Sequence, residues 1–268
     1  MRQSILALVV ALLAIPSARA TPAHDARLVA LSAALARVGI GLDTRGGGVV
    51  AAMAGCRDVV DRLQPSSCYR CILADDRDVT DDVLERIKAV VDRYPTEMLA
   101  QADIHTLKLC RRLDRVAEQH PYGGISDLDT RHAMIVVTKP EFLASIVNHE
   151  LFHMIESAFP AGMDEHDAEW ERANPVGFSY EAGPSSSETK KARPAGFVNW
   201  YAASALQEDR GSTFEYMMAE PEALCEMATN DPVVHAKVKI ILARLKTFTG
   251  GYDLMDTLAP CVRSAGWR

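Results

Sequence analysis

The strongest constraint on this 268-residue chain is a pair of histidines four residues apart, in the sequence His-Glu-Leu-Phe-His at 149–153. Residues four apart on an α-helix are offset by only about 40° around its axis, so His149 and His153 can reach one metal ion. Glu150 lies about 100° further round, which keeps its carboxylate off the metal but within reach of a metal-bound water. The pattern therefore predicts a helix that carries two zinc ligands.

The alternative is a buried helix whose polar side chains are satisfied by other protein groups. Two imidazoles and a carboxylate on an otherwise apolar helix are costly to bury without a metal or partners, which favours the metal site. Zinc lowers the pKa of a bound water to about 7, and a carboxylate can take its proton and pass it to a leaving amine. Amide hydrolysis is the expected chemistry, with Glu150 as general base.

A catalytic zinc needs a third protein ligand and leaves the fourth position for water. The metzincin pattern is excluded, because Glu156 and Phe159 stand where it requires Gly and His. The remaining candidates are Asp164, His166, Glu169 and Glu208. The first three are close in sequence but follow a Pro-Ala-Gly break, whereas Glu208 lies on a separate predicted helix, which would hold a ligand more firmly.

Helical periodicity and capping residues predict helices at 25–38, 50–63, from Thr80 to before Pro95, 199–219 and 232–248. Partial alternation and β-branched residues predict strands at 104–113 and 133–138, separated by a turn at 121–124. Thr138 and Glu141 have the spacing of a capping box, which would begin the histidine-bearing helix. Asp231, followed by Pro232, predicts the start of the last helix.

The residues that follow the HExxH helix resemble the zinc-binding metallopeptidases of the gluzincin type, related to the catalytic domain of anthrax lethal factor. The matching pieces are Trp170, Asn174-Pro175, Phe178-Ser179-Tyr180, Gly196-Phe197, Tyr201-Ala202 and Glu208-Asp209. The resemblance covers about 94–248. It implies that Glu208 is the third zinc ligand and that Tyr201, seven residues earlier, stabilises the developing oxyanion.

One position departs from that family. Its members carry a second glutamate one turn after the ligand, which orients a zinc histidine, whereas this chain has Ser212 there. Asp209 and Glu215 are the candidates to replace it.

The expected fold class is α+β and zincin-like, with a small sheet packed on the HExxH helix and a mostly helical C-terminal half that brings in Glu208. Three parts are expected: a signal peptide at 1–20, a helical N-terminal region with a cysteine-containing loop at 21–93, and a zincin-like metallopeptidase domain at 94–268. Residues 21–93 match no known pattern.

Residues 1–20 have the features of an export signal: Arg2, an apolar run at 5–15 and an Ala-Arg-Ala cleavage site at 18–20. The run is too short for a membrane anchor, which needs about 20 apolar residues. The mature chain is expected to be secreted or periplasmic, without a membrane span. Its 27 basic and 36 acidic residues give a net charge of about −9, which argues against nucleic acid as a partner.

All six cysteines follow the signal, and an even number in an oxidising compartment predicts disulfides with few or no free thiols. Cys68 and Cys71 form a CxxC pattern, which also occurs in redox and zinc sites. No second CxxC and no preceding strand accompany it, so a structural disulfide is favoured.

Two functions remain open. The first is a peptidase that cleaves protein or peptide substrates, with strand 133–138 offering its edge to an extended substrate. The second is a zinc-binding or interaction protein that has lost turnover. Retention of Glu150 favours the enzyme, because a binding protein has no need of a general base. A purely structural, disulfide-linked domain would leave the HExxH motif unexplained.

Overall fold

The computed structural model describes residues 21–44, 49–51, 69–115, 121–159, 166–180 and 193–251. The signal segment 1–20, most of the helix expected at 50–63, Cys68 and Asp164 lie outside these ranges. The described chain is mixed α+β, with one sheet and the helices α1 to α8, which confirms the expected class. Within these ranges, no helix combines the length and apolarity that crossing a membrane requires.

The sheet has the order β2-β3-β4-β6-β5, with β1 paired to the first part of β4. Its strands are β1 Gly41–Asp43, β2 Val49–Ala51, β3 Tyr69–Leu73, β4 Thr106–Arg115, β5 Gly124–Asp127 and β6 His132–Val136. Strands β4 and β6 are parallel, and β5 runs antiparallel to β6 at one end of the sheet. On the other side, β3 is antiparallel to β4 and carries β2.

The two predicted strands are present as β4 and β6, but their arrangement corrects two expectations. Along the chain, β5 comes between β4 and β6. Its sequence Gly-Ile-Ser-Asp has low strand propensity and begins in the predicted turn. The strand predicted at 133–138 does not offer an edge, because β6 lies between β4 and β5. The edge on that side of the sheet belongs to β5.

The N-terminal region is not simply helical. Helices α1 Pro22–Ala36 and α2 Asp81–Val91 form as predicted, and the Thr80 side chain accepts a hydrogen bond from the Val83 amide. The prediction of a helix at 50–63 is wrong at its first residues, which belong to strand β2. The cysteine-containing loop is also not entirely irregular, because it contains strand β3. These strands pair into the same sheet as β4, so residues on both sides of position 94 build one sheet.

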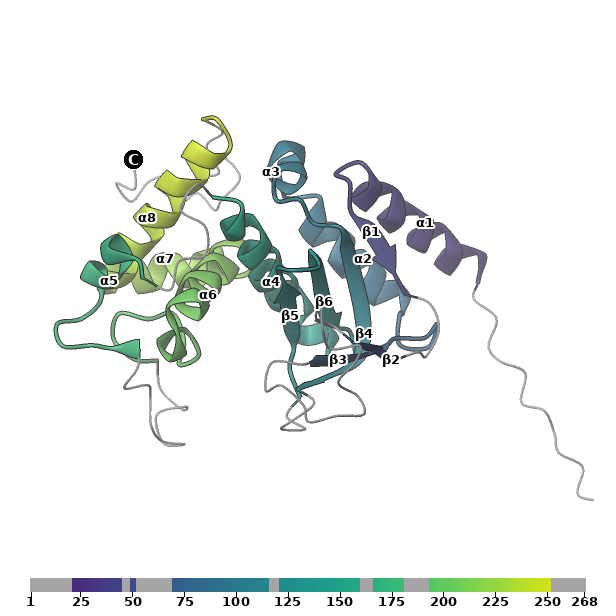
Figure 1. Ribbon diagram of the computed structural model, residues 1–268, viewed down its shortest axis with the longest axis horizontal. Coiled ribbons are helices and arrows are strands. Elements are labelled where there is room, and N and C mark those ends of the chain that lie inside the picture. The colour runs from purple at the N-terminus through teal and green to yellow at the C-terminus, as the bar shows by residue number, and fades with distance from the viewer. Residues whose placement is uncertain are drawn as a thin grey trace, which may run out of the picture.

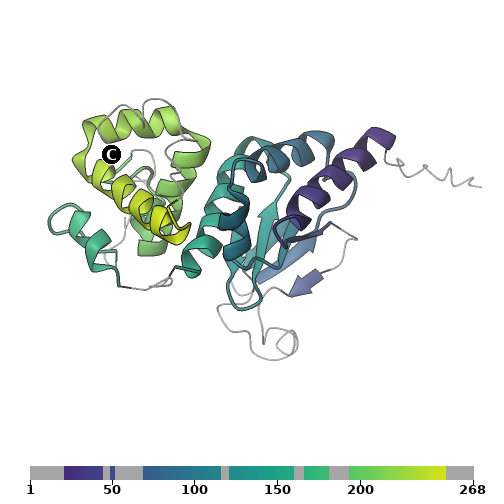
Figure 2. The same cartoon turned by 90° about the horizontal axis from the view of Figure 1, so that it is seen from above.

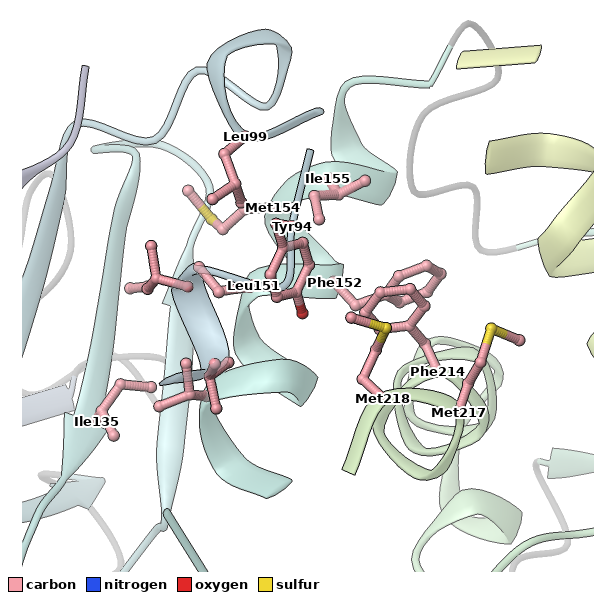
Figure 3. Close-up of a cluster of buried hydrophobic side chains, with 14 of the residues drawn as sticks. Tyr94, Leu99, Ile135, Leu151, Phe152, Met154, Ile155, Phe214, Met217 and Met218 are labelled. Carbon is pink, nitrogen blue, oxygen red and sulfur yellow. The ribbon is translucent and has the colours of Figure 1, made fainter. Parts of the chain in front are cut away.

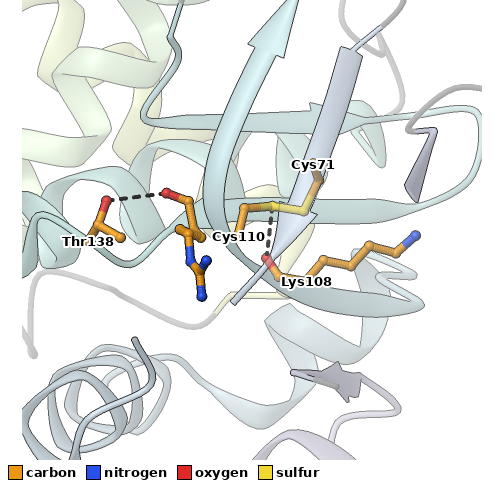
Figure 4. Close-up of a disulfide and its surroundings, with 5 residues drawn as sticks. Cys71, Lys108, Cys110 and Thr138 are labelled. Atoms are coloured by element: carbon orange, nitrogen blue, oxygen red, sulfur yellow. Dashed lines mark hydrogen bonds between the residues drawn. A yellow bond between two sulfur atoms is a disulfide. The ribbon is translucent and has the colours of Figure 1, made fainter. Parts of the chain in front are cut away.

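The predicted capping box at Thr138 is wrong. The Thr138 hydroxyl donates to the carbonyl of Arg111 on β4, at 3.3 Å, instead of capping the next helix (Figure 4). A short 3₁₀ turn, Pro140–Phe142, leads into α4 Leu143–Ser157, which carries the HExxH motif. Helix α4 therefore begins without a side-chain cap.

Helix α4 lies between the sheet and the helical C-terminal group (Figures 1 and 2). That group contains α5 Ala168–Ala173, α6 Leu206–Ala219, α7 Pro221–Asn230 and α8 Pro232–Phe248, while α3 Thr96–Gln101 packs near α4 on the other side. One main core joins the sheet, α4 and α6. Within it Phe152 stacks on Phe214, with ring centroids 4.5 Å apart (Figure 3).

The C-terminal helices follow the prediction in part. Asp231 caps α8 by accepting from the amides of Val233 and Val234, as its sequence predicts. The helix expected at 199–219 is interrupted, because Ala205 is extended (φ −158°, ψ 158°) and separates a short 3₁₀ turn, Ala202–Ser204, from α6. Helix α7 was not predicted.

A disulfide joins Cys71 of β3 to Cys110 of β4, with Cα atoms 5.5 Å apart (Figure 4). Both cysteines belong to a second, smaller core on the opposite face of the sheet, together with Leu113, Met134 and Val136. No cysteine of the described ranges is free. Cys71 thus has the structural role expected for it, and a disulfide of this kind suggests an oxidising compartment.

Asp167 ties α5 to two other helices. Its carboxylate receives hydrogen bonds from Arg210 of α6 and Arg244 of α8, each at 2.9 Å, and caps the Trp170 amide. Burial alone would raise the pKa of Asp167, but the bonds from Arg244 and Trp170 outweigh it and lower the pKa to about 2. A carboxyl whose pKa falls on folding stabilises the folded state above its unfolded pKa.

We predict that Asp167→Asn, which keeps a capping side chain, destabilises the protein by about 2 kcal/mol near pH 6. The difference from wild type should shrink as the pH falls from about 4 towards 2, because the wild-type carboxylate is then protonated. Urea unfolding at several pH values measures this, with the exposed Glu97→Gln as control. A difference that stays constant between pH 6 and pH 3 would contradict the charge-based account.

Candidate metal centre

Two imidazoles and one carboxylate meet where α4 crosses α6. The Nε2 atoms of His149 and His153 are 3.0 Å apart, and Glu208 Oε2 lies 2.9 Å from the first and 3.7 Å from the second. Both histidines are buried, while Glu208 is partly exposed. The donor atoms of these three residues all lie within 4.8 Å of one another, which makes them a group able to hold one metal ion.

Gly211 allows the two helices to approach this closely. A Cβ atom at this position would lie 2.9 Å from Cε1 of both His149 and His153, closer than Cβ atoms pack in proteins. The residue is in the middle of α6, where glycine lowers helix stability by about 1 kcal/mol relative to alanine. The glycine is needed because the rings occupy the space of a side chain.

The donor set fits zinc. Two histidine nitrogens and a glutamate oxygen are ligands that a catalytic zinc takes, leaving one position open. Among the described contacts His153 Nδ1 has no hydrogen-bond partner, although it is buried. Burial lowers the pKa of His149, but hydrogen bonds to Glu208 and Glu215 outweigh it and raise the pKa to about 10. The carboxylates around the imidazoles thus favour a positive charge at this point.

Glu215 orients His149 from behind. Its Oε2 lies 3.2 Å from His149 Nδ1, and the residue is two turns after Glu208 on α6. Of the two sequence candidates for this role, Glu215 therefore contacts a histidine and Asp209 does not. A carboxylate at this position fixes the ring so that Nε2 points towards the metal position.

Asp209 lies instead in a buried network behind Glu208. It pairs with Lys237 of α8 at 2.6 Å and receives hydrogen bonds from Trp170 at 2.8 Å and Tyr180 at 2.5 Å. Lys237 also donates to the Gly196 carbonyl, and its ammonium lies 3.8 Å from the centre of the Phe197 ring. Trp170, Tyr180 and Lys237 thus meet at Asp209, in the first turn of α6.

Glu150 lies beside these donors and contacts strand β5. The Ser126 hydroxyl of β5 lies 2.8 Å from its Oε2 and 2.7 Å from its backbone carbonyl, and can donate to one of them at a time. Burial raises the pKa of Glu150, and the neighbouring His149 and His153 lower it only in part. Gly124 of β5 is equally close, since a Cβ there would lie 2.6 Å from the Glu150 side chain.

Tyr201 is near the centre, although it does not share a helix with Glu208 as the helix predicted at 199–219 required. It precedes the extended Ala205 and is not on the helix of Glu208. Its ring centroid is 5.9 Å from that of His149, and the residue is 38% exposed. Burial, with the negative charges of Glu208 and Glu150, raises the pKa of Tyr201 well above its usual range. The phenol stays protonated and able to donate a hydrogen bond.

The other ligand candidates do not join this group. The side chain of His166 is 93% exposed and lies 3.8 Å from Glu171, while Glu169 binds Arg244. Asp164 is outside the described ranges.

Two hollows flank the centre, one on each side of Gly124, Glu150 and Tyr201. The first, about 260 Å³, is lined among others by Tyr69, Ser126, Asp127 and Gln207. The second, about 340 Å³, is lined among others by Tyr122, Ile146, Trp200 and Glu215. The candidate centre is thus open to solvent through a groove rather than enclosed.

The fold is similar to that of a known protein. The crystal structure of a "putative zinc-binding metallo-peptidase" from Bacteroides caccae superposes with a TM-score of 0.54, covering 92% of each chain at 11% sequence identity. No family model matches this chain, and neither does any curated protein sequence. The comparison therefore shows that this chain shares its fold with that protein.

Sequence reasoning missed Ser126, Gly124 and the role of Gly211. Both are on β5, which the sequence did not predict: Gly124 fell in the predicted turn at 121–124 and Ser126 in no predicted element, so nothing indicated that they contact Glu150. Gly211 did carry a signal, since a glycine in the middle of a helix usually has a packing reason.

We predict that Gly211→Ala lowers zinc affinity at least about tenfold, because the new methyl displaces both imidazoles. Helix propensity alone would make Gly211→Ala a more stable protein, so a loss of zinc affinity cannot be attributed to a weaker helix. The matched control is Ser212→Ala on the same helix, whose buried hydroxyl has no hydrogen-bond partner among the described residues. Chelator competition measures both affinities. Unchanged affinity in Gly211→Ala would show that α4 and α6 do not need this contact.

Proposed function

We propose that this chain is an exported zinc metallopeptidase that hydrolyses peptide bonds. The observation that carries the proposal is the convergence of His149, His153 and Glu208 on one point, with Glu150 beside them. The metallopeptidase-like fold supports it independently of the motif. Within this proposal the fold is zincin-like and of the gluzincin type related to lethal factor, with residues 94–268 as the catalytic part.

His149, His153 and Glu208 are the zinc ligands in this proposal. A bound zinc would supply a Lewis acid that lowers the pKa of a water molecule to about 7 and polarises the scissile carbonyl. Glu150 is the residue that would accept a proton from the attacking water and pass it to the leaving nitrogen. Ser126 holds the Glu150 carboxylate, at 2.8 Å.

Tyr201 completes the proposed machinery. It donates a hydrogen bond to the carbonyl oxygen, where negative charge develops. Its hydroxyl keeps its proton because burial and the nearby carboxylates raise its pKa. Glu215 keeps His149 oriented through Nδ1, at 3.2 Å.

Export is part of the same proposal. The features of residues 1–20 suit a cleaved signal peptide, and the Cys71–Cys110 disulfide suits an oxidising compartment. The substrate is a protein or peptide, placed in the groove beside the edge strand β5. Nucleic acid is disfavoured by the acidic charge of the chain.

The purified mature protein should hold about one zinc per chain, and Glu150→Gln should keep the metal while abolishing proteolysis. Glu208→Ala should weaken zinc binding by at least about tenfold, whereas His166→Ala, its control, should leave binding unchanged. Elemental analysis, chelator competition and digestion of unfolded casein measure these effects.

The outcomes separate the alternatives. If Glu150→Gln were as active as the wild type, Glu150 would not be the general base. Stoichiometric zinc without proteolysis by the wild type would identify a zinc-binding or interaction protein that has lost turnover. If His166→Ala weakened zinc binding more than Glu208→Ala did, the assignment of Glu208 as the third ligand would be wrong.

A further inference from the structure

Glu208, the third ligand of the proposed zinc site, stands on a helix start that has no side-chain cap. It is in the first turn of α6, and Ala205, the residue at the N-cap, makes no capping hydrogen bond through its side chain. The first turn of a helix frays readily when its amides lack capping partners. A ligand there needs another anchor, because a functional side chain has to stay within about 0.5 Å of its working position.

Asp209, the next residue, supplies an anchor through Lys237 of α8. The distance between Asp209 Oδ2 and Lys237 Nζ is 2.6 Å, and the same oxygen accepts hydrogen bonds from Trp170 and Tyr180. Both charged side chains are fully buried, at 0% and 1% exposure. A buried ion pair keeps its geometry, because separating its members would leave each charge uncompensated in the interior. The first turn of α6 is therefore fixed to α8.

The same ammonium holds a second segment. Lys237 Nζ donates to the Gly196 carbonyl at 2.7 Å and lies 3.8 Å from the centre of the Phe197 ring. Gly196 has a φ of +85°, a conformation that favours glycine, and its amide donates to Asp231 at 2.8 Å. Tyr201 follows five residues later. The segment that leads to the proposed oxyanion donor is thus also fixed to α8, at the same atom of Lys237.

Stability alone does not require an ammonium at this point. Replacing a buried ion pair by neutral side chains of similar size is often without cost, or even stabilising. An ammonium differs from an apolar side chain in carrying three donors that diverge from one atom. In Lys237 these donors reach two segments that are distant from each other in structure type: the start of a helix at Asp209 and a loop at Gly196.

We propose that Lys237 is a positioning residue for the metal centre, which sets Glu208 through Asp209 and sets Tyr201 through Gly196. The assignment rests on the proposed function of these two residues. Lys237 acts only through its neighbours and is not itself a ligand or a proton carrier. One buried side chain thereby fixes the third zinc ligand and the oxyanion donor to the same helix.

The first test removes both charges together. In the double variant Asp209→Asn with Lys237→Met no charge is left alone in the interior, so its urea midpoint should stay near that of the wild type. Its zinc affinity, measured by chelator competition, should fall at least about tenfold, because Glu208 has lost its anchor. The control is Val238→Ala, a fully buried apolar residue on the same helix. It should lower the urea midpoint and keep the wild-type zinc affinity.

The second test separates the two connections. The single variant Asp209→Asn keeps the bond from Lys237 to Gly196, so its zinc affinity should fall while kcat for casein at saturating zinc stays close to that of the wild type. The double variant also releases Gly196, and its kcat should fall at least about tenfold below that of the single variant. KM should change little, because neither Lys237 nor Gly196 lines the two hollows beside the centre.

Three results would overturn the role of Lys237. The first is a folded double variant with wild-type zinc affinity. The second is an equal loss of affinity in Val238→Ala, since the effect would then follow stability. The third is a double variant that does not fold, which would make the pair a requirement of the fold rather than of the site. Equal kcat values in the single and double variants would overturn the connection to Tyr201.

These outcomes are distinct from a failure of the proposed function. A wild type that binds no zinc overturns the proposed metal site itself. A wild type that binds zinc with the same affinity as the double variant overturns only the role of Lys237. The affinity measurement uses zinc alone and needs no turnover, so it decides the connection to Glu208 even in a protein without peptidase activity.

Discussion

The candidate site depends on the close approach of α4 and α6. At Gly211 the helix backbone of α6 comes so near the imidazoles of α4 that a methyl group would lie 2.9 Å from both. The same crossing brings Glu208 to the histidines and stacks Phe152 on Phe214. Packing of apolar side chains stabilises this interface, and the absence of a side chain at Gly211 allows the short distance between the two helices.

Burying charge at that interface requires compensation, and the chain provides it in pairs. Arg210 lies 2.5 Å from Glu156 of α4, and Lys237 lies 2.6 Å from Asp209. Each pair joins α6 to another helix, so neither charge is left alone in the interior, where it would be costly. The three candidate donors are on α4 and α6, the two helices that the Arg210–Glu156 pair joins, so helices rather than loops hold them.

The parts of the fold that the sequence predicts are those stabilised locally. Helices α2 and α8 begin at Thr80 and Asp231 because these side chains bond amides only two or three residues away. Strands β2 and β5 have no such local signal, since three or four residues gain stability only from the neighbouring strands. Thr138 shows the reverse case. A capping pattern was present, but the Thr138 hydroxyl donates a hydrogen bond to the carbonyl of Arg111, which is distant in sequence.

The same distinction holds at the site. The sequence alone determined that His149, Glu150 and His153 share one helix, because helical spacing fixes their directions. It also limited the third donor to four residues. Only the tertiary structure brought Glu208 to the histidines, assigned Glu215 to His149 and Asp209 to Lys237, and set Ser126 against Glu150. Those contacts join residues 24 to 66 positions apart, and their geometry follows from helix and strand packing that no local pattern encodes.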